Sequence, residues 1–396
     1  MFSKLSVTQP ELTEILKSSI ETDTFSNSSL FCGPSYSSKM TAAIEVAKAL
    51  SCFTDKKGEG CDCQSCKAYD NYLMQNLVVI SNRDFENRID VSIQSFVKNR
   101  DSFSKDYLIK TIRIFLLSYH NGVYTDKNKK LFESAYEVSE LINDFSKIGE
   151  NFKIREAQRF AKELKQKLKP LISVSNKNLT ALSVDGVRSL QTWVSNTLVN
   201  EKARIVVIEA IEKSNDSVRN SLLKILEEPN ENVYFILLSN NPSRIIKTIL
   251  SRVRKYNFLP IDEQIQKQLL NPFKIEDETI NTFEKFFLTA SGYKSKEVES
   301  SLDIIVESVI KKRQLSSEQL AFVIKALDSS NQDEFILHQL LSKIKQKFLD
   351  NEIENSVCKN IIKDVSLLYN NQRIFNLPKK NMYENVYRKM MENINA

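Results

Sequence analysis

Short apolar runs alternate with longer segments of helical periodicity along the first 260 residues of this 396-residue chain. Five runs have the character of strands: SLFC (29–32), LVVI (77–80), ARIVVI (203–208), VYFILL (233–238) and, more weakly, RKYNF (254–258). Apolar, β-branched runs of this kind are typical of strands that helices cover on both faces. We therefore predict an α/β domain with a five-stranded parallel sheet over residues 1–260.

Two other parts of the chain show helical spacing without such runs. Residues from about 84 to 178 interrupt the α/β alternation, and we expect them to form a helical insertion. After Pro260 a series of amphipathic segments follows, several of them opened by Asp, Ser or Asn residues that suit helix N-caps. This pattern predicts one or two small all-α domains after the α/β domain.

Composition and charge narrow the class of protein. With 41% apolar residues, 27% charged residues and only seven glycines, the chain is suited to a helix-rich fold and not to disorder. The net charge of +6 permits contact with nucleic acid without arguing for it. No stretch approaches the roughly 20 apolar residues of a membrane span, and the first residues lack the apolar block of a signal peptide. We expect a cytoplasmic protein without a membrane partner.

The last helix predicted within the insertion is strongly basic. Glu156 and Glu163 are interleaved with seven basic residues: Lys153, Arg155, Arg159, Lys162, Lys165, Lys167 and Lys169. Such a run is either a solvated helix face or an arm that contacts DNA or a protein partner. The sequence leaves both interpretations open.

Four of the six cysteines fall within residues 52–66, namely Cys52, Cys61, Cys63 and Cys66. In a reducing compartment this clustering indicates a metal site before it indicates disulfides. Four thiolates on a loop that contains Gly58 and Gly60 can converge on one Zn²⁺ in tetrahedral geometry, and the expected role is structural. Because Cys61 and Cys63 are one residue closer than in the usual C-x-x-C motif, three ligands, a distorted loop or a set of free thiols stay open.

Residues 32–40, CGPSYSSKM, nearly match the phosphate-binding pattern G-x-x-x-x-G-K-[ST] between a strand and a helix. Gly33 and Lys39 fit the pattern. Ser38, however, stands where the second glycine lets the backbone approach phosphates, and Met40 stands where a hydroxyl reaches Mg²⁺. The loop is either a working nucleotide site or a loop that keeps the shape of such a site for other reasons.

The end of the run at 203–208 has a second altered motif. In P-loop ATPases a strand ends in an Asp that holds Mg²⁺, followed by a Glu that polarises the attacking water. Glu209 and Ala210 occupy these two positions, and a methyl group cannot orient water. Glu212 is expected to be a solvated residue at a helix start and not a replacement base.

Arg252 follows a helix-like stretch and precedes the last predicted strand. It is either part of a surface ion pair, worth under about 1 kcal/mol, or an arginine finger delivered to the nucleotide of a neighbouring subunit. Periodicity does not choose between these roles.

Taken in order, these motifs resemble the bacterial DNA polymerase III clamp-loader subunits, the gamma/tau and delta-prime family of AAA+ proteins. Residues 220–253 are similar to the family's N-x-L-L-K-x-L-E-E-P motif, sensor-1 strand and S-R-C box, here S-R-V. Residues 182–194 are similar to the segment before the Walker B strand, and the Walker A helix leads directly into the cysteine cluster. The resemblance covers residues 20–83 and 180–260, extends to the C-terminal helices only in general character, and leaves out 84–178.

The resemblance implies a three-part chain. Its first part is an α/β parallel five-stranded AAA+ P-loop-type domain at 1–260, with a zinc module at 52–66 and the helical insertion. An all-α lid at 261–312 and an all-α collar at 313–396, through which five subunits form a ring, would follow. The matching positions are Lys39 for the Walker A lysine, Glu209 for the Walker B aspartate, Ser239 or Asn240 for sensor 1, and Arg252 for the arginine finger. The sensor-2 arginine has no match, and Lys294 and Lys296 lie near its place.

The altered positions also carry a functional expectation. Four elements for hydrolysis are altered or missing: Ser38 with Met40, Glu209, Ala210 and the sensor-2 arginine. Without the Mg²⁺-binding hydroxyl, the water-orienting carboxylate and the sensor-2 charge, the γ-phosphate loses stabilising partners, so ATP turnover is expected to be negligible. An altered site beside an intact finger is the delta-prime pattern. It implies a non-hydrolysing subunit with structural Zn²⁺ that joins gamma/tau and delta subunits and helps to load the sliding clamp onto primed DNA. The alternatives are an ATP-hydrolysing gamma/tau-like motor subunit and a zinc-stabilised scaffold or DNA-repair adaptor.

Overall fold

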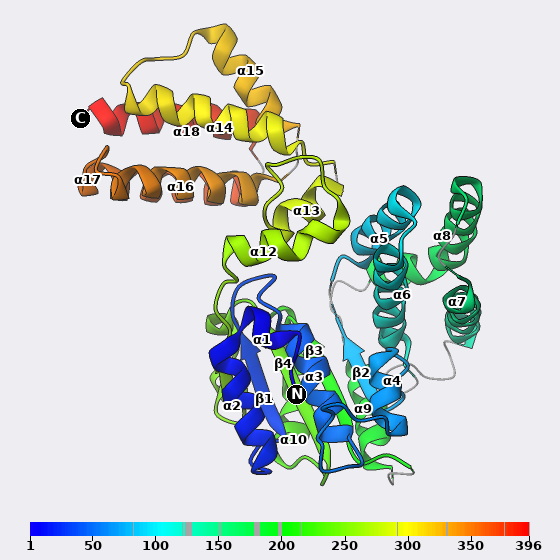
Figure 1. Ribbon diagram of the computed structural model, residues 1–396. Coiled ribbons are helices and arrows are strands. Elements are labelled where there is room, and N and C mark those ends of the chain that lie inside the picture. The colour runs from blue at the N-terminus through cyan, green and yellow to red at the C-terminus, as the bar shows by residue number, and fades with distance from the viewer. Residues whose placement is uncertain are drawn as a thin grey trace. The chain divides into compact units, whose positions relative to one another are not determined.

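The computed structural model of the chain divides into two compact units (Figure 1). Unit 1 comprises Met1–Lys274 and Thr282–Glu284, and unit 2 comprises Ile275–Asn281 and Lys285–Ala396. The structure describes residues 1–81, 83–120, 122, 129–149, 152–177, 183–196, 200–214, 216–290, 292–329, 332–375 and 377–395. The end of the predicted insertion and the first residue of the motif at 182–194 lie outside these described residues.

A five-stranded parallel sheet forms the centre of unit 1. Its strands are β1 (Ser28–Cys32), β2 (Leu77–Ile80), β3 (Arg204–Glu209), β4 (Val233–Ser239) and β5 (Arg254–Asn257). They lie in the order β2-β3-β4-β1-β5, and every neighbouring pair is parallel. The five predicted strands are thus confirmed. β5 gave the weakest signal because it is an edge strand in which only Tyr256 is buried.

Helices cover both faces of the sheet, as uninterrupted apolar strands require. One face packs against α1 (Leu5–Thr8), α2 (Pro10–Glu21), α3 (Lys39–Ser51) and α4 (Gln64–Asp70). The other face packs against α9 (Val184–Ser195), α10 (Asp216–Glu227) and α11 (Lys247–Leu250). Successive strand residues alternate between the two cores, so that Leu30 lies in one and Phe31 in the other. The parallel order brings the carboxyl ends of all five strands to one edge of the sheet.

The described part of residues 84–178 contains helices and no strand, as the spacing predicts. It forms α5 (Phe85–Asn99), α6 (Ser102–Leu116), the 3-10 turn η1 (Leu117–Tyr119), α7 (Lys129–Lys147) and α8 (Ile154–Lys177). These helices have an apolar core of their own. Aromatic packing contributes to it, with the rings of Phe145 and Phe160 stacked 3.9 Å apart. That the segment is an insertion stays an interpretation from the sequence.

Short elements complete unit 1: η3 (Ile211–Lys213), η4 (Pro242–Arg244), α12 (Glu263–Leu270) and η5 (Asn271–Phe273). The helices after them are α13 (Phe283–Ala290), α14 (Ser295–Ile310), α15 (Ser317–Asp328), α16 (Asp333–Leu349), α17 (Asn355–Phe375) and α18 (Lys379–Asn395). None of the helices in the described residues has the length and apolar character needed to cross a membrane.

The described residues of unit 2 contain helices and no strand, which agrees with the all-α prediction. A single apolar core joins residues of α14 to residues of α15, α16, α17 and α18. This core therefore includes residues on both sides of the predicted boundary between lid and collar at 312/313. The two boundaries at 260/261 and 312/313 stay predictions.

Candidate functional site

The loop between β1 and α3 has the strand-turn-helix path of a phosphate-binding loop. A methyl group at Gly33 would lie 2.3 Å from the carbonyl oxygen of Phe258, so only glycine fits there. Ser38 precedes α3 with a φ of 67°, in the left-handed region that glycine adopts freely and other residues adopt at a cost of about 1–2 kcal/mol. The serine thus keeps the backbone shape of the glycine that it replaces.

Lys39 is turned back onto its own loop. Its Nζ donates to the carbonyl oxygen of Gly33 at 2.8 Å, to Ser37 Oγ at 3.1 Å and to the carbonyl oxygen of Pro34. The side chain is buried, and burial lowers the pKa of Lys39 to about 8 although the nearby Glu209 carboxylate opposes that shift. The ammonium group is held by carbonyl and hydroxyl oxygens of the loop itself.

Met40 points into the apolar core on the α3 side of the sheet, with 6% of its surface exposed. In the pattern of a phosphate-binding loop this position supplies a hydroxyl to Mg²⁺. A thioether in a packed core offers no such ligand, because it is a weak acceptor enclosed by apolar side chains.

Glu209 ends β3 and is bound by an arginine that the sequence analysis did not single out. Arg83 follows the neighbouring strand β2, and its Nε and Nη2 atoms each donate to a Glu209 oxygen at 2.7 Å. Ser81 Oγ also donates to this carboxylate. Burial alone would raise the pKa of Glu209, but the charge and hydrogen bonds of Arg83, with the bond from Ser81, outweigh it and lower the pKa. Both carboxylate oxygens are therefore engaged within the chain.

A second arginine brings α5 close to the same loop. The guanidinium of Arg88 lies 5.7 Å from the centre of the Tyr36 ring, within the range of a cation–π contact. The sequence offered one usable signal for Arg83 and Arg88. Both follow the strand at 77–80, and the carboxyl ends of neighbouring parallel strands meet at one edge of a sheet.

Ala210, Ser239 and Asn240 lie at the same edge of the sheet. Ala210 presents only a methyl group and has a positive φ of 54°. Ser239 is buried, and its Oγ accepts from the Asn241 N–H at 3.0 Å. Asn240 reaches the loop, with its Nδ2 donating to Ser35 Oγ at 3.1 Å. Of the two sensor-1 candidates, Asn240 is therefore the one whose side chain contacts the loop between β1 and α3.

Glu212 is not the solvated residue that the sequence analysis expected. It lies in η3, is half-buried, and its Oε1 accepts from the Asn240 N–H at 3.4 Å. Its Oε2 is buried without a hydrogen-bond partner among the described residues. The expectation of a solvated side chain failed because η3 packs against β4, which periodicity does not reveal. That Glu212 is not a replacement base stays a prediction.

Arg252 lies between α11 and β5 and is paired within the chain. Its guanidinium forms an ion pair with Glu227 at the end of α10, and its Nη1 donates to the carbonyl oxygen of Thr248 at 2.7 Å. The Arg252 side chain keeps 31% of its surface exposed and that of Glu227 keeps 46%. The surface ion pair considered from the sequence is thus present, and a finger role stays a prediction.

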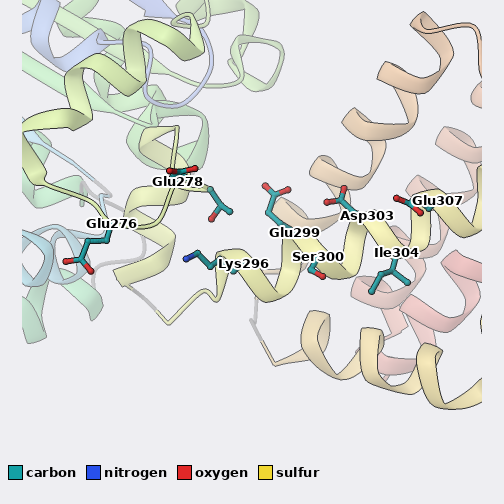
Figure 2. Close-up of a pocket in the computed structure, with 9 residues that line it drawn as sticks. Glu276, Glu278, Lys296, Glu299, Ser300, Asp303, Ile304 and Glu307 are labelled. Carbon is teal, nitrogen blue, oxygen red and sulfur yellow. The ribbon is translucent and has the colours of Figure 1, made fainter.

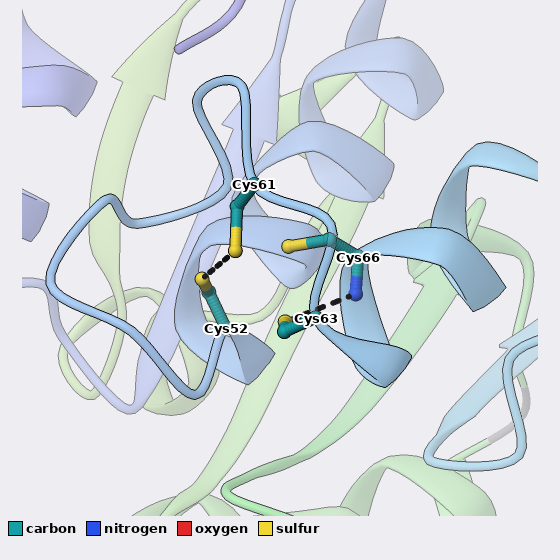
Figure 3. Close-up of side chains that lie close together, drawn as sticks. All are labelled: Cys52, Cys61, Cys63 and Cys66. Carbon is teal, nitrogen blue, oxygen red and sulfur yellow. Dashed lines mark hydrogen bonds between the residues drawn. The ribbon is translucent and has the colours of Figure 1, made fainter.

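The four cysteines of residues 52–66 converge (Figure 3). Cys52 ends α3, Cys63 and Cys66 belong to the start of α4, and all four sulfur atoms lie within 4.8 Å of one another. A tetrahedral Zn²⁺ with Zn–S distances of about 2.3 Å requires sulfurs about 3.8 Å apart, and Cys52 Sγ lies 3.7 Å from Cys61 Sγ. The short spacing between Cys61 and Cys63 does not prevent the approach.

Hydrogen bonds support this cluster. Thr54 Oγ1 lies 3.2 Å from Cys61 Sγ, and the Cys66 N–H donates to Cys63 Sγ at 3.5 Å. The bond to Thr54 lowers the pKa of the Cys61 thiol to about 6, whereas burial raises the pKa of Cys66. The described residues therefore hold four sulfur ligands at distances that suit one metal ion.

Near the predicted place of sensor 2, unit 2 has a pocket of about 670 Å³ (Figure 2). Lys296 lines it beside five carboxylates, those of Glu276, Glu278, Glu299, Asp303 and Glu307. Lys296 Nζ lies 3.9 Å from Asp277, and Lys294 pairs with Glu297 at 3.1 Å. So many carboxylates repel phosphates, and the pocket is not suited to bind a nucleotide.

Comparisons with known proteins agree with the order of the motifs. Residues 8–262 match the protein family described as "DNA polymerase III, delta subunit". A DNA polymerase III subunit delta' of Buchnera aphidicola is 30% identical over 116 residues, which are 29% of this chain and 33% of that protein. A DNA polymerase III subunit gamma/tau of Mycobacterium bovis is 30% identical over 87 residues, or 22% of this chain and 15% of that protein.

A crystal structure of a DNA polymerase III gamma subunit-related protein from Thermotoga maritima shares 17% sequence identity with this chain. The matched region covers 53% of this chain and 79% of that protein. The TM-score of 0.26 is too low to compare the folds. The chain spans a third or less of the length of the two curated relatives named above. The family match, by contrast, extends over more than half of the chain. The resemblance seen in the motifs is thereby confirmed, and the chain belongs to the DNA polymerase III delta-subunit family.

Proposed function

We propose that the chain is a delta-prime-like clamp-loader subunit that does not hydrolyse ATP. It acts in the cytoplasm within the DNA polymerase III holoenzyme, in a pentameric ring with gamma/tau and delta subunits. The ring uses ATP hydrolysed by other subunits to load the sliding clamp onto primed DNA. Family membership and the relatives named delta' support this role.

The engagement of Glu209 by Arg83 carries the non-hydrolysing part of the proposal. Mg²⁺ at a P-loop site requires a free carboxylate at the end of this strand, and a bidentate guanidinium already occupies both oxygens of Glu209. Met40 and Ala210 supply neither the hydroxyl nor the water-orienting carboxylate. Single partners of this kind are worth about 10²-fold or more in rate, so their combined loss makes turnover negligible.

The role left to the loop is structural. Gly33 allows β5 to approach, and Ser38 keeps the turn that starts α3. α3 in turn leads into the cysteine cluster, where Cys52, Cys61, Cys63 and Cys66 would hold a structural Zn²⁺. The metal would cross-link the end of α3 to the start of α4.

The active contribution is Arg252 as an arginine finger for a neighbouring subunit. To act in trans, its guanidinium must leave Glu227. The pair is half exposed, and ion pairs of that kind contribute only about 0–1 kcal/mol. Release therefore costs little compared with the charge-assisted bonds that a γ-phosphate offers.

The test measures Mg-ATP binding and hydrolysis by the full chain alone, then after mixing with gamma and delta subunits from the same source. We expect no turnover by the chain alone, and a large loss of ATPase activity in complexes that carry Arg252→Ala. Glu227→Ala is the matched control, because it breaks the same ion pair but keeps the finger, and it should leave activity intact.

Three results would overturn parts of the proposal. Turnover by the isolated chain that disappears with Lys39→Ala would make it an ATP-hydrolysing gamma/tau-like motor. Equal activity of wild-type and Arg252→Ala complexes would remove the finger from the mechanism. Failure to assemble with gamma and delta subunits would favour a scaffold or repair adaptor.

A further inference from the structure

Helix α8 carries a line of positive charge that the fold does not use. Its 24 residues bury one face in the core of the neighbouring helices through Ala157, Ala161, Leu164, Leu168 and Leu171. At 100° per residue, the opposite side of the helix carries four exposed basic residues: Arg155, Arg159, Lys162 and Lys169. We call these four residues the α8 stripe.

The basic residues at the flanks of α8 behave differently from the stripe. Lys165 pairs with Asp90 of α5 at 2.6 Å, and Lys167 pairs with Glu137 of α7 at 2.9 Å. These two lysines neutralise carboxylates on the helices against which α8 packs (Figure 1). None of the four stripe residues forms an ion pair with another residue that the structure describes. The two flanking lysines therefore stabilise the packing of α8 through ion pairs, and the stripe residues make no such ion pair with the described residues.

The charge is concentrated as well as aligned. α8 holds seven Lys or Arg residues against two Glu, in a chain whose whole net charge is +6. Like charges three and four positions apart on one helix face repel each other by about 0.2–0.5 kcal/mol per pair. The two Glu of α8 lie at that spacing from Arg159 and from no other residue of the stripe. An anionic partner relieves that repulsion.

We propose that the α8 stripe binds the phosphate backbone of duplex DNA. From Arg155 to Lys169 the stripe extends for about 21 Å at 1.5 Å per residue, the length of about six base pairs. Arginine suits phosphate because its planar guanidinium can donate two parallel hydrogen bonds. This contact goes beyond the proposed function, which assigns no part of residues 84–178 to DNA.

The residues between the basic ones favour nucleic acid over an acidic protein. The exposed neighbours along this face include Gln158, Gln166 and Ser173, which can donate to phosphate oxygens. No large apolar side chain is exposed between Arg155 and Lys169. Protein interfaces rely on buried aromatic or aliphatic anchors, and this face offers none.

The test measures binding of the full chain to a fluorescent 30-base-pair duplex by anisotropy between 50 and 200 mM salt. Four phosphate contacts predict a slope of log K against log salt of about −3.6, equal to a loss of about 10²-fold in affinity over that range. Changing all four stripe residues to Gln should abolish most binding and bring the slope close to zero. Because the stripe is exposed, the thermal unfolding of this variant should match that of the wild type.

The matched control removes the same charge from unit 2 through Lys325→Gln, Lys345→Gln, Lys359→Gln and Lys363→Gln, four exposed lysines. It should bind DNA as the wild type does. Equal losses of DNA affinity in both variants would mean that diffuse net charge binds DNA, and would overturn the proposal that the stripe does. Undiminished DNA binding by the stripe variant would overturn the proposal as well. Stronger competition by poly-glutamate than by unlabelled DNA would assign the stripe to an acidic protein instead. None of these results bears on assembly with other subunits, so they leave the proposed function intact.

Discussion

The bond between Arg83 and Glu209 offers the most direct test of the proposed site, through the free energy of unfolding. The side chains of Arg83 and Glu209 keep only 24% and 15% of their surface exposed. Removing one partner of a buried ion pair costs about 3–5 kcal/mol, because the other charge is left unpaired. Since this pair is partly exposed, we expect Arg83→Ala to lose about 2–3 kcal/mol at pH 7.

The double variant Arg83→Met, Glu209→Leu separates this charge effect from packing. It leaves no buried charge behind, so its free energy of unfolding should return to within about 1 kcal/mol of the wild type. Urea unfolding followed by fluorescence suits the measurement, because Trp193 is the single tryptophan and packs against a core of unit 1. Equal urea midpoints for wild type and Arg83→Ala, or a double variant as unstable as the single one, would refute the reasoning.

The pH dependence of the free energy of unfolding offers a second test of the bond between Arg83 and Glu209. The pKa of Glu209 in the folded chain lies below its ordinary value of 4.5. The pair's contribution is therefore complete above pH 4.5 and is lost as the pH falls through the lower, folded-state pKa. In Arg83→Ala, only the Ser81 hydrogen bond and the charge of Arg88 oppose burial, so the pKa of Glu209 should rise relative to the wild type. The difference in stability between the two proteins should shrink as the pH falls, and a constant difference would contradict this assignment.

Two further predictions concern the cysteine cluster and the loop. Protein purified without chelator should contain about one zinc per chain. Cys66→Ser should lose the metal and unfold at a lower temperature. Cys358 is a buried thiol of unit 2, and the control variant Cys358→Ser should keep the metal. Metal-free protein that is fully folded would reject the site. Gly33→Ala should destabilise unit 1 by about 1–3 kcal/mol through overlap with Phe258, while Gly149→Ala, which meets nothing within 4 Å, should change the urea midpoint little. Similar effects of both glycine changes would argue against the close approach of Phe258.

Local patterns in the sequence were sufficient for the strands and the helices. The strands β1 to β4 are buried over nearly their whole length, and each contains at least three consecutive apolar residues. Each run could therefore be recognised without knowledge of its neighbours. The helices of residues 84–178 could likewise be predicted from their periodicity, although no motif in that segment resembled the family. The order of motifs, rather than any one of them, was enough to indicate the family.

The residues of the candidate site could be predicted only in part from the sequence. Lys39, Met40, Glu209 and Ala210 were singled out because they occupy fixed positions in the motifs of P-loop ATPases, and spacing is a property of the sequence. Arg83 was missed because it pairs with a residue 126 positions away. Nothing local to either residue encodes that pairing, which follows from β2 lying beside β3 in the sheet.

The sequence by itself determined the elements, the cysteine cluster and the departures from the phosphate-binding pattern, because each depends on residue types at short, fixed spacing. Only the tertiary structure decided that all four sulfurs meet, that Glu209 is neutralised within the chain and that Arg252 rests on Glu227. It also decided which basic residues of α8 are paired and which are not. The physical reason is common to these cases: electrostatic and metal–ligand interactions depend on distances of a few ångströms between side chains, and those distances are set by packing between elements that lie far apart in the sequence.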